Sequence, residues 1–385
     1  MICYIGHNLL LPGIAGKQTF HRQGISSIHL SLSGNQQKMV NTKERKKYFI
    51  QQFLQEEYLH GGVGVRDAEK ILLAKGFEPV LFPHQHSFSL AAKFSRFFFL
   101  IRMFFRIRKG SVLVFLFPVY AGMNTLLLYF LRKKKGISLV CFIADINGIK
   151  DGDEKLLVKE TRFLKQFSYF IVHNDSMKEW LYKNGLADTK VVTIEFFDFL
   201  TAPVAGQRDI SYNIVFAGNL EKSSFLRDLH LLGKNNSALH FHLYGAGQGD
   251  EVLTQKDVTW HGVEKPYDLP GKLQGSFGLL WDGDSIDKPG GNFGYYLQFI
   301  SHHKLSLYIL SKLPIIAPAS AGSAPLIEKY RIGILVNSMY EIEDRISTIT
   351  ADEYQEMQIN MQPLAEKISN GECLGNAMDE IMKWV

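Results

Sequence analysis

Short apolar runs alternate with amphipathic segments along most of the chain, and this alternation predicts its secondary structure. The runs are rich in β-branched and aromatic residues, which favours buried strands. Between them, apolar residues recur three and four positions apart, as on one face of a helix. The first series comprises strands at 48–51, 78–82, 111–117, 138–143, 169–173 and 191–194, and helices at 65–75, 91–108, 121–135, 154–166 and 176–184. Such alternation indicates βαβ units and a parallel sheet.

A second series of the same kind follows a segment with the composition of a linker. Residues 199–209 are rich in proline, glycine and small side chains, which favours an irregular connection. Strands are then predicted at 213–216, 240–244, 259–261, 278–281, 314–317 and 333–336. The fold class is therefore α/β, with two Rossmann-like domains and a ligand cleft between them at the carboxyl ends of the strands.

This pattern divides the chain into four segments. Residues 1–45, which have mixed polarity and frequent glycine and serine, are predicted to be a weakly ordered extension. Residues 46–200 and 210–370 form the two Rossmann-like domains, and residues 371–385 form a C-terminal helix. Composition agrees with this division, because 385 residues with 46% hydrophobic side chains are enough for two cores.

Neither the cysteines nor the apolar runs indicate an exported or membrane-spanning protein. Cys3, Cys141 and Cys373 lie far apart, without the spacing of a metal site or a disulfide framework, which is typical of a reducing compartment. The uncharged run at 110–131 is long enough to span a bilayer, but Pro118 interrupts it, which favours a strand, a turn and a helix. No clear signal peptide precedes it, so the expected location is the cytoplasm.

Positive charge is concentrated in one segment. Residues 91–136 contain ten Lys and Arg residues and no Asp or Glu, whereas the whole chain has a formal net charge of only +5. Phenylalanines interleave with the arginines between residues 94 and 108. This pattern predicts a basic amphipathic helix at an anionic surface, such as the inner face of the cell membrane. The alternative is a helix packed on the sheet with its arginines in solvent. Nucleic acid is not favoured, because no recognition motif accompanies the charge.

Residues 294–336 combine several features of a nucleotide-diphosphate site. Lys304 stands at the head of an apolar helical run, where its compact ammonium would suit a diphosphate. The alternative is a lysine that reaches solvent among surface histidines. His302 and His303 are adjacent, so they cannot point the same way and are poor partners for a metal.

The same stretch continues with a short strand and a loop of small residues. The loop 320–323, which ends at Ser323, would bind phosphate through its backbone amides at the start of the next helix. That helix carries Glu328, whose carboxylate could accept hydrogen bonds from ribose hydroxyls.

Two glycine-containing turns follow strands of the second series. In the first, Gly218 allows close backbone approach, Asn219 could cap a helix, and Lys222 could reach an anion. The alternative is an ordinary turn between strand and helix with an exposed lysine. The second turn, at 244–249, resembles a dinucleotide fingerprint, but its third glycine comes one residue early. We therefore reject an NAD site and predict a tight strand exit near the cleft.

Asp145 ends a strand of the first series. A catalytic carboxylate that faces the cleft is expected at this place, although a strand-end aspartate also commonly caps the following loop. Asp67 and His173 are lesser candidates for a catalytic group.

Seven motifs, in this order, carry a resemblance to a known family. They cover roughly residues 47–370 and are GGVGVRDAEKILLAKGF (61–77), CFIADING (141–148), FIVHNDSMKEWLYKNG (170–185), IVFAGNLEKSSFL (214–226), FHLYGAG (241–247), GSFGLLWDGD (275–284) and YYLQFISHHKLSLYILSKLPIIAPASAGSAPLIEKYRIGILV (295–336). Together they resemble the GT-B glycosyltransferases, and more narrowly the bacterial group of β-1,6-galactofuranosyltransferases and the streptococcal glucosyltransferase 3.

The resemblance implies two Rossmann-like domains that face each other across a cleft. The C-terminal domain would bind a UDP-sugar, with Asn219 and Lys222 near the diphosphate, Lys304 on the phosphates and Glu328 near the ribose. The N-terminal domain would bind a glycan or lipid-linked acceptor of surface polysaccharide synthesis. Transfer of the hexose would need no metal and no cofactor, because basic side chains and helix dipoles would stabilise the leaving UDP. Inversion would need one carboxylate base, for which Asp145 is the candidate.

The chain departs from the group at two positions. The group often has histidine where this chain has Ala144, and tyrosine where it has His303. Two other functions remain open: a non-catalytic GT-B module that docks or stabilises a partner glycosyltransferase, and a UDP-sugar epimerase. The resemblance is compatible with assembly into a homo-oligomer.

Overall fold

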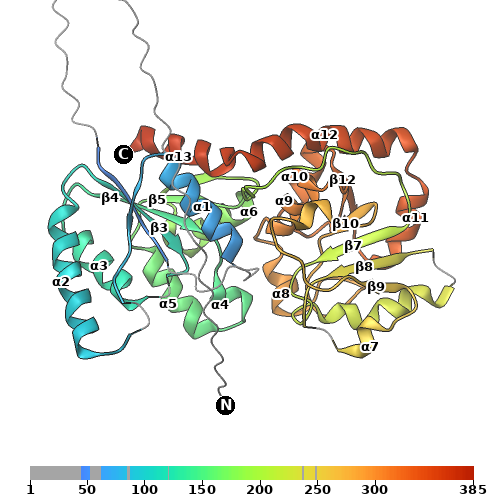
Figure 1. Ribbon diagram of the computed structural model, residues 1–385, viewed down its shortest axis with the longest axis horizontal. Helices are drawn as coiled ribbons and strands as arrows, with labels where there is room; N and C mark the ends of the chain where they lie inside the picture. The colour runs from blue at the N-terminus through green and yellow to red at the C-terminus, as the bar shows by residue number, and fades with distance from the viewer. Residues whose placement is uncertain (1–44, 53–61, 85–86, 120, 236–237, 248) are drawn as a thin grey trace, which may run out of the picture. The chain divides into compact units, whose positions relative to one another are not determined.

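The computed structural model describes residues 45–385 apart from 53–61, 85–86, 120, 236–237 and 248, so the predicted N-terminal extension lies outside the described residues except at Arg45. Two parallel sheets correspond to the two predicted series (Figure 1). Each predicted strand is present, with its ends displaced by two residues at most. The α/β fold class with two Rossmann-like domains is therefore confirmed.

The first sheet has the strand order β2-β1-β3-β4-β5-β6. Its strands are β1 (Lys47–Ile50), β2 (Glu78–Val80), β3 (Val112–Phe117), β4 (Ser138–Ile143), β5 (Tyr169–Val172) and β6 (Lys190–Thr193). The α-helices between them are α1 (Val63–Ala74), α2 (Leu90–Arg106), α3 (Gly122–Arg132), α4 (Asn147–Lys150), α5 (Glu154–Leu164) and α6 (Asp175–Leu181). Every residue of β3 is apolar and buried, as expected for a parallel strand covered by helices on both faces.

The second sheet has the strand order β12-β11-β10-β7-β8-β9. Its strands are β7 (Asn213–Ala217), β8 (His240–Tyr244), β9 (Val258–Trp260), β10 (Phe277–Leu279), β11 (Ile315–Pro318) and β12 (Gly333–Val336). The accompanying α-helices are α7 (Asp250–Leu253), α8 (Gly291–Tyr296), α9 (His303–Leu310), α10 (Ala324–Tyr330), α11 (Ile342–Ser347) and α12 (Ala351–Ser369). A 3₁₀ segment at Ser224–Asn235 stands where a helix would connect β7 to β8.

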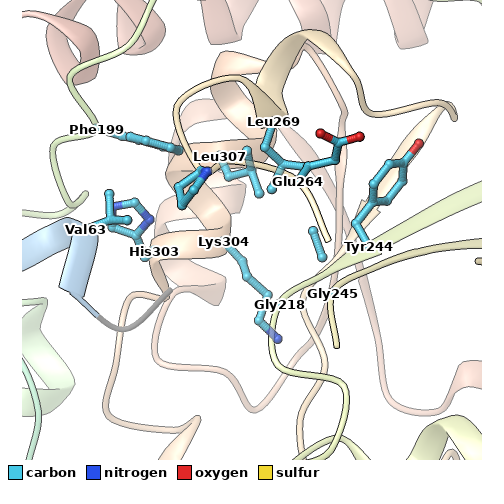
Figure 2. A pocket seen from close by; sticks show the side chains of 12 residues that line it. Val63, Phe199, Gly218, Tyr244, Gly245, Glu264, Leu269, His303, Lys304 and Leu307 are labelled. Atoms are coloured by element: carbon cyan, nitrogen blue, oxygen red, sulfur yellow. The ribbon is translucent and has the colours of Figure 1, made fainter. Parts of the chain in front are cut away.

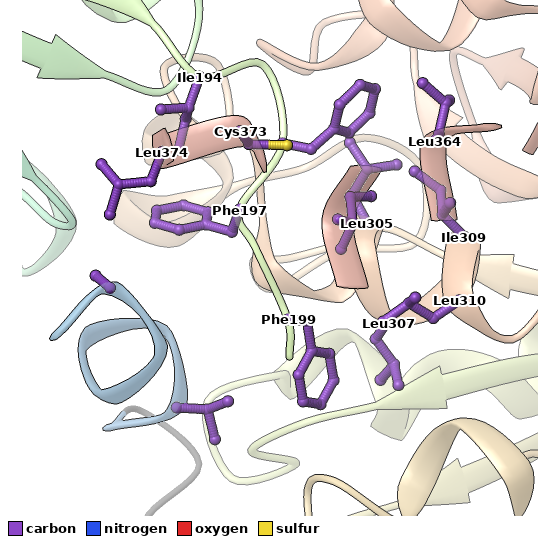
Figure 3. Close-up of a cluster of buried hydrophobic side chains, with 14 of the residues drawn as sticks. Ile194, Phe197, Phe199, Leu305, Leu307, Ile309, Leu310, Leu364, Cys373 and Leu374 are labelled. Atoms are coloured by element: carbon purple, nitrogen blue, oxygen red, sulfur yellow. The ribbon is translucent and has the colours of Figure 1, made fainter. Parts of the chain in front are cut away.

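The last two helices join the sheets. α12 packs on α9, and α13 (Glu372–Trp384) returns to pack on α1, β5 and β6. Phe197 and Phe199 of the connecting segment share one buried cluster with α9 and with Leu374 of α13 (Figure 3). Asp198 accepts hydrogen bonds from the backbone amides of Cys373 and Leu374 at 2.9 and 2.7 Å, and so caps α13. These contacts fix the connection between the sheets.

The described residues of the uncharged run at 110–131 form β3 and most of α3, which agrees with the predicted strand and helix. Among the described residues, no helix is both long enough and apolar enough to cross a membrane.

Candidate active site

The candidate site lies where the strand order of the second sheet reverses. β7 has β8 on one side and β10 on the other, so the connections leave these strands in opposite directions and open a crevice at their carboxyl ends. Gly218 and Asn219 follow β7, and Asp282 follows β10. All three residues line one cavity, which therefore occupies the switch point of the sheet.

Side chains from both sheets line this cavity. Asp145 follows β4 of the first sheet, whereas Asn219, Lys222 and Lys304 belong to the second. Four of the six predicted site residues therefore meet in one place. The first turn of α9, which begins at His303, lines the same cavity and adds the positive end of a helix dipole to these lysines.

Lys304 is held by a buried carboxylate. Its Nζ lies 3.0 Å from Oδ1 of Asp282, and Nε2 of His302 lies 2.9 Å from Oδ2, with all three side chains only 14–17% exposed. Lys304 Nζ also lies 4.2 Å from the ring centroid of Phe216. Burial by itself would raise the pKa of Asp282, but the charges of Lys304 and His302 outweigh it and hold that pKa well below its usual range. The cluster presents a fixed cation to the cavity.

A second, mostly apolar hollow adjoins the cavity and shares Gly218, His303 and Lys304 with it (Figure 2). Its floor depends on two glycines, because a Cβ on Gly245 would lie 1.8 Å from the carbonyl oxygen of Gly218. Both glycines have positive φ, at 140° and 151°. Glu264 is the carboxylate of this hollow. The backbone at 244–247 is thus a tight strand exit beside the cleft.

Asp145 is oriented by partners from both sheets. Its Oδ1 accepts a hydrogen bond from the Tyr296 hydroxyl at 3.0 Å, and its Oδ2 lies 2.7 Å from Nζ of Lys150. Burial and the charge of Asp145 raise the pKa of Tyr296 well above its usual range, so the hydroxyl stays a donor. The side chain of Asp145 is 39% exposed and remains accessible from the cavity.

The alternative role of Asp145, capping of the following loop, falls to another residue. The backbone amides of Asn147 and Gly148 donate to the carboxylate of Glu160 at 3.2 and 2.7 Å. Glu160 is 6% exposed, so a buried side chain caps the loop that follows β4. Asp145 is not needed for this capping and lies at the cavity surface.

His173 is a neutral side chain that joins the two sheets. Its ring lies at the end of β5, where Nε2–H donates to the carbonyl of Ile143 at 3.0 Å and Nδ1 accepts from the backbone amide of Ser301 at 3.3 Å. Burial lowers the pKa of His173 to about 4. Two hydrogen bonds and 2% exposure give it a structural role at the edge of the cavity.

Lowering the pH from about 7 to about 5 is expected to weaken the fold through His173. Because the folded pKa lies below the unfolded value, its stabilising contribution is complete above about pH 6.5 and is lost as the pH falls toward 4, about 2 kcal/mol by pH 5. Urea unfolding at several pH values measures this. The variant His173→Asn should show a shallower pH dependence than wild type, whereas His230→Asn, at an exposed histidine, should not. Equal profiles for all three proteins would contradict the assignment.

The structure does not bring Ser323 and Glu328 to the cavity. The hydroxyl of Ser323 is fully buried, and the amides of Ala321 and Gly322 donate to the carbonyls of Pro318 and Leu297, so these two amides of the predicted phosphate loop already have partners. Glu328 lies in the last turn of α10 and lines a different hollow near α11 and α12. Neither residue lines the cavity that brings the other four together, so the phosphate contact and the ribose contact remain predictions.

Asp67, the lesser catalytic candidate, is a structural anchor. It is fully buried and accepts hydrogen bonds from the backbone amide of Leu200 at 2.9 Å and from the Tyr267 hydroxyl at 2.7 Å, with Lys70 Nζ at 3.0 Å. All of its oxygens are engaged away from the cavity.

Sequence reasoning missed three polar groups. Asp282 comes just after β10, where the strand-end rule that selected Asp145 would also have found it. Glu264 lies beyond the end of β9, where no local motif indicates a binding role. The bond from Tyr296 to Asp145 joins residues 151 positions apart. Within the described part of the chain, no group of three or more His, Cys, Asp or Glu side chains could hold a metal ion.

Comparison with known proteins agrees over both sheets. Residues 47–196 match the glucosyltransferase 3-like N-terminal domain, and residues 214–381 match the glucosyltransferase 3-like C-terminal domain. The chain is 30% identical over 281 residues to the beta-1,6-galactofuranosyltransferase WbbI of Escherichia coli K12, which covers 71% of this chain and 79% of that protein. It is 26% identical over 252 residues to glucosyltransferase 3 of Streptococcus gordonii, covering 64% and 72%.

Solved structures share the fold at low sequence identity. HepE from Anabaena, determined in complex with UDP, superposes with a TM-score of 0.57 at 13% identity and covers 89% of this chain and all of that one. Sucrose-phosphate synthase from Thermosynechococcus elongatus superposes with a TM-score of 0.56 at 13% identity, covering 89% and 99%. Both similarities extend over the two sheets.

Proposed function

We propose that this chain, which belongs to the glucosyltransferase 3-like family and is a glycosyltransferase of the GT-B type, transfers a hexose from a UDP-sugar to a glycan or lipid-linked acceptor. The hexose is of the galactofuranose or glucose type, as in the names of the two relatives. One observation carries the proposal: a carboxylate of the first sheet and a fixed cation of the second line the same cavity.

In this proposal the donor binds to the second sheet. Lys304 contacts the diphosphate, Asn219 and Lys222 lie beside it, and the dipole of α9 adds to their positive potential. The uracil would occupy the apolar hollow beside Gly245, and Glu264 replaces Glu328 as the carboxylate for ribose hydroxyls. The UDP complex of HepE, which has the same fold, supports the choice of nucleotide.

The reaction we propose is an inverting displacement that needs no metal. Asp145 takes a proton from the acceptor hydroxyl while the acceptor oxygen attacks the anomeric carbon and the bond to UDP breaks. Tyr296 and Lys150 keep the carboxylate in one orientation. The leaving diphosphate gains negative charge, which Lys304 and Lys222 stabilise in place of a divalent cation.

The experiment that tests this function has two parts. Calorimetric titration should show binding of UDP and much weaker binding of ADP and GDP, and incubation with UDP-glucose, UDP-galactose and UDP-galactofuranose should release UDP from one donor above the others. A protein that binds no UDP and turns over no donor would instead be a non-catalytic module. A donor converted to an isomer without release of UDP would indicate an epimerase.

A further inference from the structure

Helix α2 has two apolar faces on opposite sides. The inner face contributes Ala92, Leu100 and Met103 to the buried core. The outer face carries five residues at the helical spacing i, i+3, i+4, i+7 and i+11, each between 38% and 67% exposed: Phe94, Phe97, Phe98, Ile101 and Phe105. The packing on the sheet predicted as an alternative is real, but it uses only one face of the helix. Within the described part of the chain, the four phenylalanines of this stripe remain largely exposed to solvent.

The exposed stripe continues onto neighbouring segments. Phe88 lies just before α2 and is 82% exposed, and Leu90 is the first residue of α2 and is 74% exposed. α3 packs beside α2 through the rings of Phe104 and Phe130, whose centroids are 6.4 Å apart. Tyr129 and Phe130 of α3 are 48% and 39% exposed. We call the exposed apolar residues of 88–105 and of α3 the aromatic ridge. Contiguous apolar surface of this kind marks an interaction site in a protein.

Cations flank the aromatic ridge. Lys93 and Arg102 fall on opposite margins of the stripe at about 3.6 residues per turn, and both are exposed. Further exposed cations follow at the C-terminal ends of α2 and α3: Arg108, Lys109, Arg132, Lys133 and Lys135. Among the described residues, none of these seven has a carboxylate within ion-pair distance, whereas Arg106 pairs with Glu78. Their charge is therefore available to an external partner.

We propose that the aromatic ridge docks on an anionic lipid bilayer, with α2 lying in the plane of the membrane interface. Phenylalanines would enter the boundary between headgroups and acyl chains, and the flanking cations would meet lipid phosphates. Charge decides against a second copy of the chain, because a two-fold contact through this face would oppose cations to cations. Residues 91–136 contain no acidic side chain that could compensate. The inference goes beyond the proposed reaction and does not rest on the identity of the donor.

The test is co-sedimentation of the full chain with vesicles. Vesicles of phosphatidylglycerol and phosphatidylcholine in equal amounts should bind the protein at low salt, and binding should fall at high salt, which screens the headgroups. Phe97→Ser combined with Phe98→Ser should weaken binding roughly tenfold or more, because two inserted rings are lost. Lys93→Gln combined with Arg102→Gln should weaken it by about fivefold for each charge removed.

Matched control variants test whether the loss of any exposed apolar or basic side chain, rather than those of the aromatic ridge, weakens vesicle binding. Val158→Ser with Ile359→Ser removes apolar side chains of 58% and 60% exposure elsewhere, and binding should stay at the wild-type level. Lys183→Gln with Lys383→Gln removes two exposed cations elsewhere, with the same expectation. Circular dichroism and thermal unfolding show whether each variant is folded, and none of these residues lines the donor cavity.

Three results would overturn the proposal. Equal vesicle binding by the wild type and the ridge variants would show that the aromatic ridge does not contact the membrane. Equal binding to pure phosphatidylcholine vesicles would show that anionic headgroups are not required. A wild-type dimer in sedimentation without vesicles, dissociated by Phe97→Ser with Phe98→Ser, would assign the ridge to a second copy of the chain.

Discussion

Replacing Lys304 with alanine is expected to weaken the binding of UDP about a hundredfold, or roughly 3 kcal/mol. The lysine is largely buried and held 3.0 Å from Asp282, so its ammonium is ordered before the ligand arrives. A diphosphate in the cavity would gain a charge-assisted contact without the entropy of ordering a long side chain. Calorimetric titration with UDP measures the change directly.

The difficulty of this variant is that it leaves Asp282 with only its contact to His302. An unpaired buried carboxylate weakens the fold by itself, so Lys304→Ala is compared with the double variant Lys304→Ala with Asp282→Asn. The double variant should regain thermal stability while its affinity for UDP stays low. Lys222→Ala, at an exposed lysine of the same cavity, should have a smaller effect. Unchanged affinity in Lys304→Ala would remove this residue from the donor site.

Most of the fold could be predicted from the sequence because its signals are local. Most strands of the first sheet form short apolar runs, and β3, buried on both faces, is apolar at every position. The strand-end rule also found Asp145, and the glycine-containing turn after β7 indicated Asn219, since the carboxyl ends of parallel strands share one edge of a sheet. Neither inference needs knowledge of contacts between distant segments.

Other parts of the site depend on such contacts and could not be predicted. The amides of loop 320–323 read as free in the sequence, but Gly322 donates to Leu297, a residue of the segment after α8. Glu328 was placed on the correct helix, yet the direction in which a helix presents one side chain depends on how it packs. The orientation of Asp145 by Tyr296 requires the two sheets to meet. Long-range packing, rather than local propensity, decides these positions.

The two apolar faces of α2 are a further feature that could not be predicted from the sequence alone. The excess of phenylalanines was visible in the sequence, and it favoured an amphipathic surface helix. The alternative that the same sequence leaves open is a helix packed on the sheet with its arginines in solvent. The structure divides the apolar residues between two stripes, with Leu100 and Met103 inward and Phe98 and Phe105 outward. Only the three-dimensional arrangement separates them.

Replacing Asp145 with asparagine is expected to lower the rate of sugar transfer by about 10²- to 10⁴-fold while the affinity for UDP stays within about twofold of wild type. Asparagine keeps the hydrogen bond to Tyr296 but cannot take a proton from the acceptor hydroxyl. Release of UDP from the preferred donor measures the rate, and calorimetry measures the affinity. Tyr296→Phe removes one positioning bond of 3.0 Å and should lower the rate less. A near-normal rate in Asp145→Asn would place the base elsewhere, and an equal loss of UDP affinity would make Asp145 a binding residue.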